Sequence, residues 1–189
     1  NGDQIARRPE GMRIIAGKWR GKPLAAPAGE DTRPTSDRAR EALFSMLVSR
    51  VGAFDSLTVA DLFAGTGALG LEALSRGAAS CVFVESNPAA LKALQTNIAK
   101  TGATEISQLV AQPAESLSAA RKPCDILFLD PPYGSGLGPR VLRRIAAKGW
   151  IAPGTWVSLE TARDENVAPE GFTVDAVRDY SKARLHLLR

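Results

Sequence analysis

From residue 57 onward, short runs of hydrophobic residues alternate with longer segments whose hydrophobic positions recur at helical spacing. The runs predict seven strands, centred near Ala60, Val82, Leu109, Leu127, Val157, Val174 and Leu187. The segments between them predict helices over about residues 68–76, 88–101, 114–121 and 139–148. This alternation is typical of βαβ units, which build an α/β fold with a mostly parallel sheet and helices on both faces. The last two strands are joined too closely for a helical crossover, so the final strand is expected to be antiparallel.

The residues before this pattern predict a small appendage. Two short strands at 13–16 and 22–25 indicate a β-hairpin, and a polar linker at 27–34 leads to a helix that Thr35 or Ser36 caps. That helix should run to about residue 50 with one apolar face, made of Ala39, Leu43, Met46 and Leu47. We therefore divide the chain into an extension outside the fold (1–11), a basic hairpin and linker (12–34) and one α/β domain (35–189).

Charge is distributed unevenly along the chain. Its net charge is +4, and residues 1–40 hold nine basic and five acidic side chains, which accounts for the whole excess. A basic segment attached to a neutral domain is the pattern expected of an arm that binds nucleic-acid phosphates. Trp19 among the basic residues favours RNA over a merely solvated tail. The residues assigned to RNA binding are Arg13, Lys18, Trp19, Arg20, Lys22, Arg33 and Arg38.

The composition excludes several other classes of protein. Apolar residues make up 44% and charged residues 23%, and no apolar run approaches the roughly 18 residues of a membrane span. We expect a cytoplasmic monomer that does not bind membranes. Cys81 and Cys124 are predicted to be buried thiols, and His186, the only histidine, a surface residue of the last strand. These three residues do not form a set of metal ligands, so no metal site is expected.

A glycine turn follows the first predicted strand. Gly65, Gly67 and Gly70 satisfy the G-x-G-x-x-G pattern, and Glu85 ends the next strand twenty residues after Gly65. Such a turn and acid can hold a nucleotide cofactor and its ribose hydroxyls, in a nicotinamide enzyme as well as in a methyltransferase. Asp61, four residues before Gly65, separates these two possibilities. A carboxylate there suits a cationic amino-acid group and would contribute little to binding a pyrophosphate.

The tetrapeptide Asp130-Pro131-Pro132-Tyr133 directly follows the apolar run at 126–129, at the carboxyl end of a predicted buried strand. The Asp130 carboxylate and the Pro131 carbonyl can accept the two N–H bonds of an exocyclic amine, and Tyr133 can stack on its base. Pro131 and Pro132 stiffen the turn and remove two competing N–H donors. This arrangement suits methylation of an amino group on a planar base. The alternative is a plain turn in which Asp130 caps a helix.

With these motifs, the chain resembles the class I S-adenosylmethionine-dependent methyltransferases, which have a Rossmann-like fold. More narrowly, it is similar to the bacterial 16S ribosomal RNA guanine(966)-N2 methyltransferase family. The resemblance covers nearly all of residues 12–189 and is carried by segments 12–21, 33–38, 61–75 and 130–133. The last two segments are shared with many amino-methylating enzymes. The first two, placed ahead of the glycine motif, are much more specific.

The resemblance implies S-adenosylmethionine as cofactor and 16S ribosomal RNA, within a small-subunit particle, as substrate. The residues that would contact the cofactor are Asp61, Phe63, Ala64, Gly65, Gly67, Glu85, Ser86, Asn87, Gln112, Ala114 and Asp130. The family usually places an acid after the third strand, on the adenine amino group. Here Pro113 stands at that position, so Gln112 or a backbone group is a candidate replacement. Arg33 and Arg38, at a helix start, could close over the cofactor instead of binding RNA.

Three alternative functions stay open at this point. The acceptor could be the N6 amino group of adenine in RNA or DNA, because the motif at Asp130 accommodates either base. A nicotinamide oxidoreductase would share the glycine turn but has no need of that motif. A non-catalytic ribosome-assembly factor would retain the basic arm without needing Asp130 intact. The intact motif counts against this last alternative.

Overall fold

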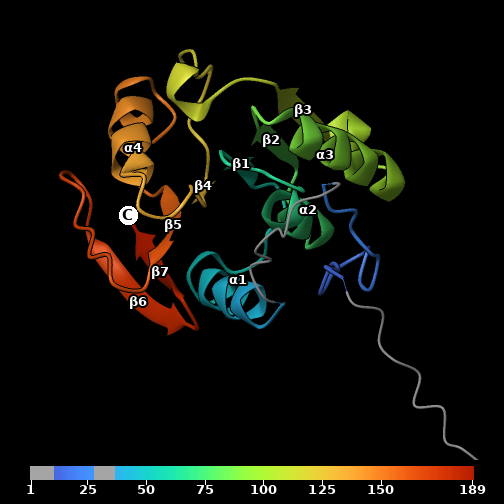
Figure 1. Ribbon diagram of the computed structural model, residues 1–189, viewed down its shortest axis with the longest axis horizontal. Helices are drawn as coiled ribbons and strands as arrows, with labels where there is room; N and C mark the ends of the chain where they lie inside the picture. Colours follow the sequence, from blue (N-terminus) through green and yellow to red (C-terminus); the bar gives the residue numbers. More distant parts are fainter. Residues whose placement is uncertain (1–10, 28–36) are drawn as a thin grey trace, which may run out of the picture.

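The computed structural model describes residues 11–27 and 37–189, and its centre is a seven-stranded sheet of order β3-β2-β1-β4-β5-β7-β6 (Figure 1). The strands are β1 (Thr58–Asp61), β2 (Ser80–Val84), β3 (Ser107–Val110), β4 (Ile126–Leu129), β5 (Trp156–Ala162), β6 (Val174–Tyr180) and β7 (Ala183–Leu188). The pairings among β1 to β5 are parallel, and β7 is antiparallel to both β5 and β6. The predicted sheet and its antiparallel end are therefore confirmed.

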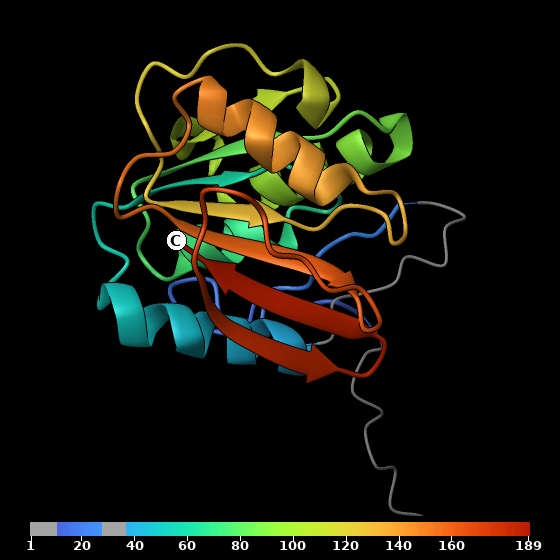
Figure 2. The same cartoon turned by 90° about the vertical axis from the view of Figure 1, so that its left-hand side faces the viewer.

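Helices cover both faces of this sheet, as predicted (Figures 1 and 2). They are α1 (Asp37–Val51), α2 (Ala68–Ser75), α3 (Pro88–Thr101) and α4 (Leu137–Ala147). Buried residues of α1, α2 and α3 form one core cluster on one face of the sheet. Every second side chain of the strands points to this face and joins the cluster, such as Val59 and Phe128. The neighbouring positions Ala60 and Leu127 point to the other face and join α4 in a second cluster. The period-two alternation of each strand thus divides the core in two.

The helix predicted over residues 114–121 is reduced to a single 3₁₀ turn, Ala114–Ser116. The backbone that follows is bonded to distant groups instead of to itself. The Leu117 carbonyl accepts from Lys148 Nζ, the Ser118 carbonyl accepts from the Trp150 indole at 2.9 Å, and the Ala120 N–H donates to the Lys148 carbonyl at 2.9 Å. Tertiary hydrogen bonds therefore override the local helical periodicity in this segment.

The predicted N-terminal hairpin is present as an antiparallel bridge between Arg13 and Pro23, without two regular strands. We call residues 12–27 the N-terminal arm. Its side chains Ile14, Trp19 and Leu24 are buried in the core cluster that contains α1, α2 and α3. The arm is therefore a packed layer of the molecule, beside α2 and α3 (Figure 1). The proposed caps Thr35 and Ser36, and Arg33, lie outside the described residues.

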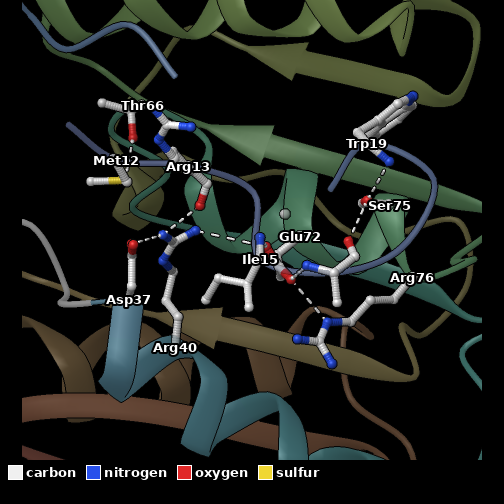
Figure 3. A network of polar contacts seen from close by, with 12 residues as sticks. Met12, Arg13, Ile15, Trp19, Asp37, Arg40, Thr66, Glu72, Ser75 and Arg76 are labelled. Atoms are coloured by element: carbon white, nitrogen blue, oxygen red, sulfur yellow. Dashed lines mark hydrogen bonds and ion pairs between the residues drawn. The ribbon is translucent and has the colours of Figure 1, made fainter. Parts of the chain in front are cut away.

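A buried carboxylate on α2 fastens this arm to the helices (Figure 3). Glu72 is fully buried and accepts from the backbone N–H groups of Ile15 at 2.9 Å and Ala16 at 3.0 Å. It also accepts from Arg76 Nε at 3.0 Å and lies 3.7 Å from Nη1 of the fully buried Arg40. Arg40 in turn donates to the Arg13 carbonyl at 2.7 Å. One acid thus accepts hydrogen bonds from the arm and from Arg76 at the end of α2, and forms an ion pair with Arg40 of α1.

His186 corrects a prediction about the last strand. It lies on β7 as expected, but its side chain is buried and its ring nitrogen Nε2 is 3.0 Å from Thr161 Oγ1. Burial lowers the pKa of His186 below its usual value of 6.5. β7 lies inside the sheet, between β5 and β6, and its side chains from Leu185 to Leu188 are buried on both faces, which alternation along a terminal strand does not reveal. Cys81 and Cys124 are buried free thiols, as predicted.

Candidate active site

A cavity of about 560 Å³ opens at the carboxyl ends of β1, β2 and β4. β1 and β4 are neighbours from which the chain proceeds in opposite directions across the sheet, and such a switch point is where open α/β sheets bind ligands. Among the predicted site residues, the cavity wall includes Asp61, Phe63, Ala64, Gly65, Glu85, Ser86, Gln112, Ala114, Asp130, Pro131 and Pro132. The fold therefore brings the glycine turn and the motif at Asp130 to one cavity.

The glycine turn has the geometry that its sequence predicts. Gly65 and Gly67 have φ angles of +55° and +86°, which other residues rarely adopt. A Cβ on Gly65 would meet no neighbour within 4 Å, so its backbone stays open to a ligand. A Cβ on Gly70 would lie 2.3 Å from the Phe83 ring and 2.7 Å from Cys81 Sγ. Gly70 therefore lets α2 pack closely on β2.

Asp61 presents a buried acceptor at the end of β1. Its Oδ2 accepts from the Gly70 N–H at 3.0 Å, while Oδ1 has no hydrogen-bond partner among the described residues. Burial raises the pKa of Asp61 to about 7; the Gly70 hydrogen bond opposes this shift and the charge of Glu85 adds to it. A cationic group in the cavity would satisfy Oδ1 and favour the ionised carboxylate.

Glu85 links the glycine turn to the loop after β2. Its Oε1 accepts from the Gly65 N–H at 2.9 Å, and its Oε2 accepts from the N–H groups of Ser86 and Asn87 at 2.7 and 2.8 Å. These bonds fix the carboxylate at the cavity wall, with lone pairs remaining for a diol. Asn87 caps α3 by accepting from the Ala90 N–H at 3.0 Å, and it is absent from the cavity wall.

An acid does line the cavity after β3, two residues beyond Pro113. Gln112, Pro113 and Glu115 all contribute to the wall. Glu115 lies in the 3₁₀ turn, and its carboxylate is 3.9 Å from Arg140 of α4. Glu115 was not among the predicted site residues because the resemblance places the family's acid at Pro113, two residues earlier.

The side chains of the motif after β4 point to different places: some line the cavity, and one contacts β5. Asp130, Pro131 and Pro132 line the cavity, whereas Tyr133 is absent from its wall. The Tyr133 hydroxyl donates to Oε1 of Glu160 on β5 at 3.0 Å. Pro131 is buried against the start of α4, where a Cβ on Gly138 would come within 3.4 Å of the Pro131 ring. The tetrapeptide is thus held between α4 and β5.

Five of the seven residues assigned to RNA binding lie on the arm, Arg38 lies on α1, and Arg33 is outside the described residues. Lys18, Arg20 and Lys22 are exposed, whereas Trp19 is buried, with Lys18 Nζ 4.5 Å from its ring centroid. The Lys18 N–H donates to Ser75 at the end of α2, and Lys22 Nζ donates to the Lys100 carbonyl near the end of α3. α2 begins at the cavity and is eight residues long, so this basic turn is displaced from the site by about 12 Å along the helix axis.

The two ends of the arm reach the cavity, which the sequence pattern does not predict. Met12 and Pro27 are part of its wall. The fully buried Asn97 of α3 joins the arm to the glycine turn, because its Nδ2 donates to the carbonyls of Ala25 at 3.0 Å and Thr66 at 2.9 Å. The sequence does carry one sign of this contact, because Asn97 is a polar residue on the apolar face of α3.

The sheet order, the glycine turn, Glu85 and the motif at Asp130 together define a class I methyltransferase. More specifically, the chain belongs to the family described as Conserved hypothetical protein 95, whose model matches residues 12–189. It is 37% identical to ribosomal RNA small subunit methyltransferase D of Escherichia coli over 150 residues, 79% of this chain and 74% of that protein. The protein of that name from Haemophilus influenzae is 34% identical over 170 residues, 86% of each chain.

Solved structures of similar proteins have the same fold. The yhhF protein of Escherichia coli superimposes with a TM-score of 0.81 at 33% identity, covering 94% of this chain and 96% of that one. A protein from Haemophilus influenzae gives a TM-score of 0.78 at 28% identity, covering 93% and 96%. Within the described residues, the structure contains no helix long and apolar enough to cross a membrane, and no cluster of side chains suited to a metal ion.

Proposed function

We propose that this protein transfers a methyl group from S-adenosylmethionine to the exocyclic N2 amine of a guanine in small-subunit ribosomal RNA. The observation that carries the proposal is the meeting of Asp61, Glu85 and Asp130 at one cavity. The first two suit the cofactor and the third suits the amine. The relatives named ribosomal RNA small subunit methyltransferase D support the choice of substrate.

The cavity residues fit the cofactor at three points. Oδ1 of Asp61, which has no hydrogen-bond partner in the described part of the chain, would accept from the amino group of the cofactor, and Glu85 would accept from its ribose hydroxyls. Gln112 or Glu115 would meet the adenine amino group, in place of the acid that the family usually has at Pro113. When bound, the cofactor supplies an activated methyl group on a sulfonium. The protein then has to position the acceptor and to stabilise charge.

Asp130 and the Pro131 carbonyl would hold the target amine. The lone pair of an exocyclic amine is delocalised into the base, so the amine is a weak nucleophile. A carboxylate that accepts one of its N–H bonds favours the positive charge that develops on nitrogen. The proton can leave after transfer, when the nitrogen has become strongly acidic, so Asp130 need not act as a base beforehand.

The wider context of the reaction is part of the same proposal. Exposed basic residues of the arm would bind RNA phosphates, and Arg38, exposed at the start of α1, would extend that surface. We infer that the monomer acts on a small-subunit particle in the cytoplasm, where ribosomes are assembled.

The test uses labelled S-adenosylmethionine and small-subunit particles from cells that lack the enzyme, followed by identification of the modified nucleoside. We expect N2-methylguanine. Asp130→Ala should lower the transfer rate by about 10²–10³, because electrostatic stabilisation of the amine is removed. Its cofactor affinity should stay within a few fold of the wild type.

Asp164→Ala, which removes an exposed acid outside the cavity wall, is the matched control and should leave the rate unchanged. Label recovered as N6-methyladenine would reject guanine as the target. Near-normal turnover of Asp130→Ala would remove this carboxylate from the mechanism.

A further inference from the structure

The carboxyl end of β5 holds a buried carboxylate that the proposed reaction has not used. Glu160 lies on β5 and is only 4% exposed. Its Oε1 accepts from the Tyr133 hydroxyl at 3.0 Å. Burying an acid is costly unless it is hydrogen-bonded, so this contact contributes to the stability of the site as well as to its geometry.

A second acid from the same region contacts the same loop. Oε1 of Glu165, in the segment after β5, accepts from the Gly134 N–H at 2.8 Å. Two consecutive residues of the loop after the Asp-Pro-Pro motif are thus bonded to carboxylates from the neighbouring strand and its extension. Pro131 and Pro132 lack N–H donors, so the bonds made by Tyr133 and Gly134 are the ones that tie this turn to β5 and the segment after it.

The hydrogen bond between Tyr133 and Glu160 restrains the orientation of the Tyr133 ring. The Tyr133 hydroxyl donates to Oε1 of Glu160, so the carboxylate holds the phenol oxygen. A tyrosine ring turns about two side-chain torsions. Its oxygen lies on the axis of the second torsion, so anchoring the oxygen limits the first. A phenolic O–H prefers to lie in the plane of its ring, so the direction of the hydrogen bond to Glu160 restrains the second torsion as well. The plane of the Tyr133 ring is therefore set from β5, next to the cavity wall formed by Pro131 and Pro132.

We propose that Glu160 is a positioning residue for methyl transfer: it holds Tyr133 in the orientation at which its ring stacks on the target base. The inference rests on the proposed function, in which Asp130 and the Pro131 carbonyl hold the target amine, and on the stacking role that the sequence predicts for Tyr133. Glu160 acts through Tyr133, so its effect should disappear when the hydroxyl is absent. It should act on the acceptor and leave the cofactor end of the cavity unaffected.

The first experiment reports on the hydrogen bond without requiring activity. The chain contains two tyrosines, so ¹³C labelling at the tyrosine Cζ gives two signals, and Tyr180→Phe assigns them. In Glu160→Ala the Tyr133 signal should move, while the Tyr180 signal stays in place. Glu160→Gln retains an acceptor oxygen and should keep the Tyr133 signal near its wild-type position. An unmoved Tyr133 signal in Glu160→Ala would overturn the inference.

The second experiment measures methylation of small-subunit particles. Glu160→Ala should lower kcat for the RNA acceptor at least tenfold with unchanged affinity for S-adenosylmethionine, because small misplacements of reacting groups are costly in rate. Glu160→Gln should recover most of this loss. Ser158→Ala, a buried change two residues earlier on the same strand face, is the control for general disturbance of β5 and should have no effect.

A double-mutant cycle separates positioning from a merely structural role. In a Tyr133→Phe background, Glu160→Ala should cause no further loss of kcat. Losses that add, or a Glu160→Ala enzyme of normal rate, would reject the inference while leaving the proposed function intact. A wild-type enzyme that methylates no RNA would instead reject the proposed function, and the carbon signals would still decide whether Glu160 holds Tyr133.

Discussion

At the scale of single residues, Asp61 shows how a binding site can be prepared at the expense of stability. Its carboxylate is buried with one oxygen lacking a hydrogen-bond partner among the described residues, and burial raises its pKa from 3.8 to about 7. Such a group is poorly solvated until a cation arrives. The unsatisfied acceptor therefore favours ligand binding over the stability of the free protein.

This arrangement predicts a pH dependence of stability. In the unfolded chain Asp61 ionises near pH 4, whereas in the folded chain it keeps its proton up to about pH 7. Between these values the folded state binds more protons, so the contribution of Asp61 to the free energy of unfolding falls as the pH rises. Asp61→Asn should remove that fall, on the order of 4 kcal/mol in all.

Urea unfolding of both proteins without cofactor, at pH 4.5 and pH 8, checks the prediction. The mutant should gain stability over the wild type at pH 8 and much less at pH 4.5. An equal difference at both pH values would contradict the elevated pKa. His186→Gln serves as a comparison with the opposite sign, because burial lowers the pKa of His186. Its stabilising contribution is complete above pH 6.5 and is lost as the pH falls below 6.5 and through the lower folded-state pKa.

At the scale of elements, the attachment of the arm to α2 depends on one carboxylate. Glu72 accepts from two arm N–H groups and from Arg76, and it faces the buried guanidinium of Arg40. Removing it would leave these donors buried without their acceptor. Glu72→Ala should therefore lower the free energy of unfolding by about 3–5 kcal/mol.

Denaturant titration followed by circular dichroism measures this loss. Glu72→Gln keeps one acceptor oxygen and should cost less than the alanine change. Glu115→Ala removes a partly exposed acid whose ion pair with Arg140 is long, at 3.9 Å, so it should be nearly neutral and provides the control. Equal, small losses in all three variants would mean that Glu72 does not hold the arm.

An element could be predicted from the sequence where its local residue pattern determines its structure. It could not be predicted where contacts with distant segments determine it. The strands, α3 and the glycine turn follow from residues close together in sequence, and they were predicted. The segment after Ala114 failed because its backbone bonds to Lys148 and Trp150, which periodicity cannot show. The approach of Met12 to the cavity and the bond between Tyr133 and Glu160 likewise depend on packing between distant segments.

At the scale of the whole molecule, the reacting centre and the exposed basic turn lie at opposite ends of α2. A substrate that contacts both has to extend along the arm, as a folded RNA can and a free nucleoside cannot. Lys18, Arg20 and Lys22 are exposed at that turn, and the Arg13 side chain is partly exposed beside it. This separation predicts that RNA affinity and cofactor affinity can be changed independently.

Replacing Arg13, Lys18, Arg20 and Lys22 together by glutamine should weaken RNA binding and leave S-adenosylmethionine affinity unchanged. The slope of the logarithm of affinity against the logarithm of salt concentration should flatten by about 0.7–0.9 for each phosphate that the variant no longer neutralises. Filter binding at three salt concentrations measures both effects.

The control carries the same change of charge elsewhere: Arg121, Lys122, Arg143 and Arg144, all exposed, replaced by glutamine. If the two quadruple variants lose affinity equally, net charge alone explains the effect. Parallel salt dependences for the wild type and the arm variant would show that RNA is held elsewhere.

The burial of the arm has a practical consequence for anyone dividing this protein into parts. Ile14, Trp19 and Leu24 fill the same apolar interior as the helices beneath the sheet, and Asn97 ties Ala25 to the glycine turn. A shortened protein starting at α1 would expose that interior to water and aggregate. Charged residues on the surface of the arm can be substituted, but the arm itself cannot be deleted or replaced by another segment without loss of the fold.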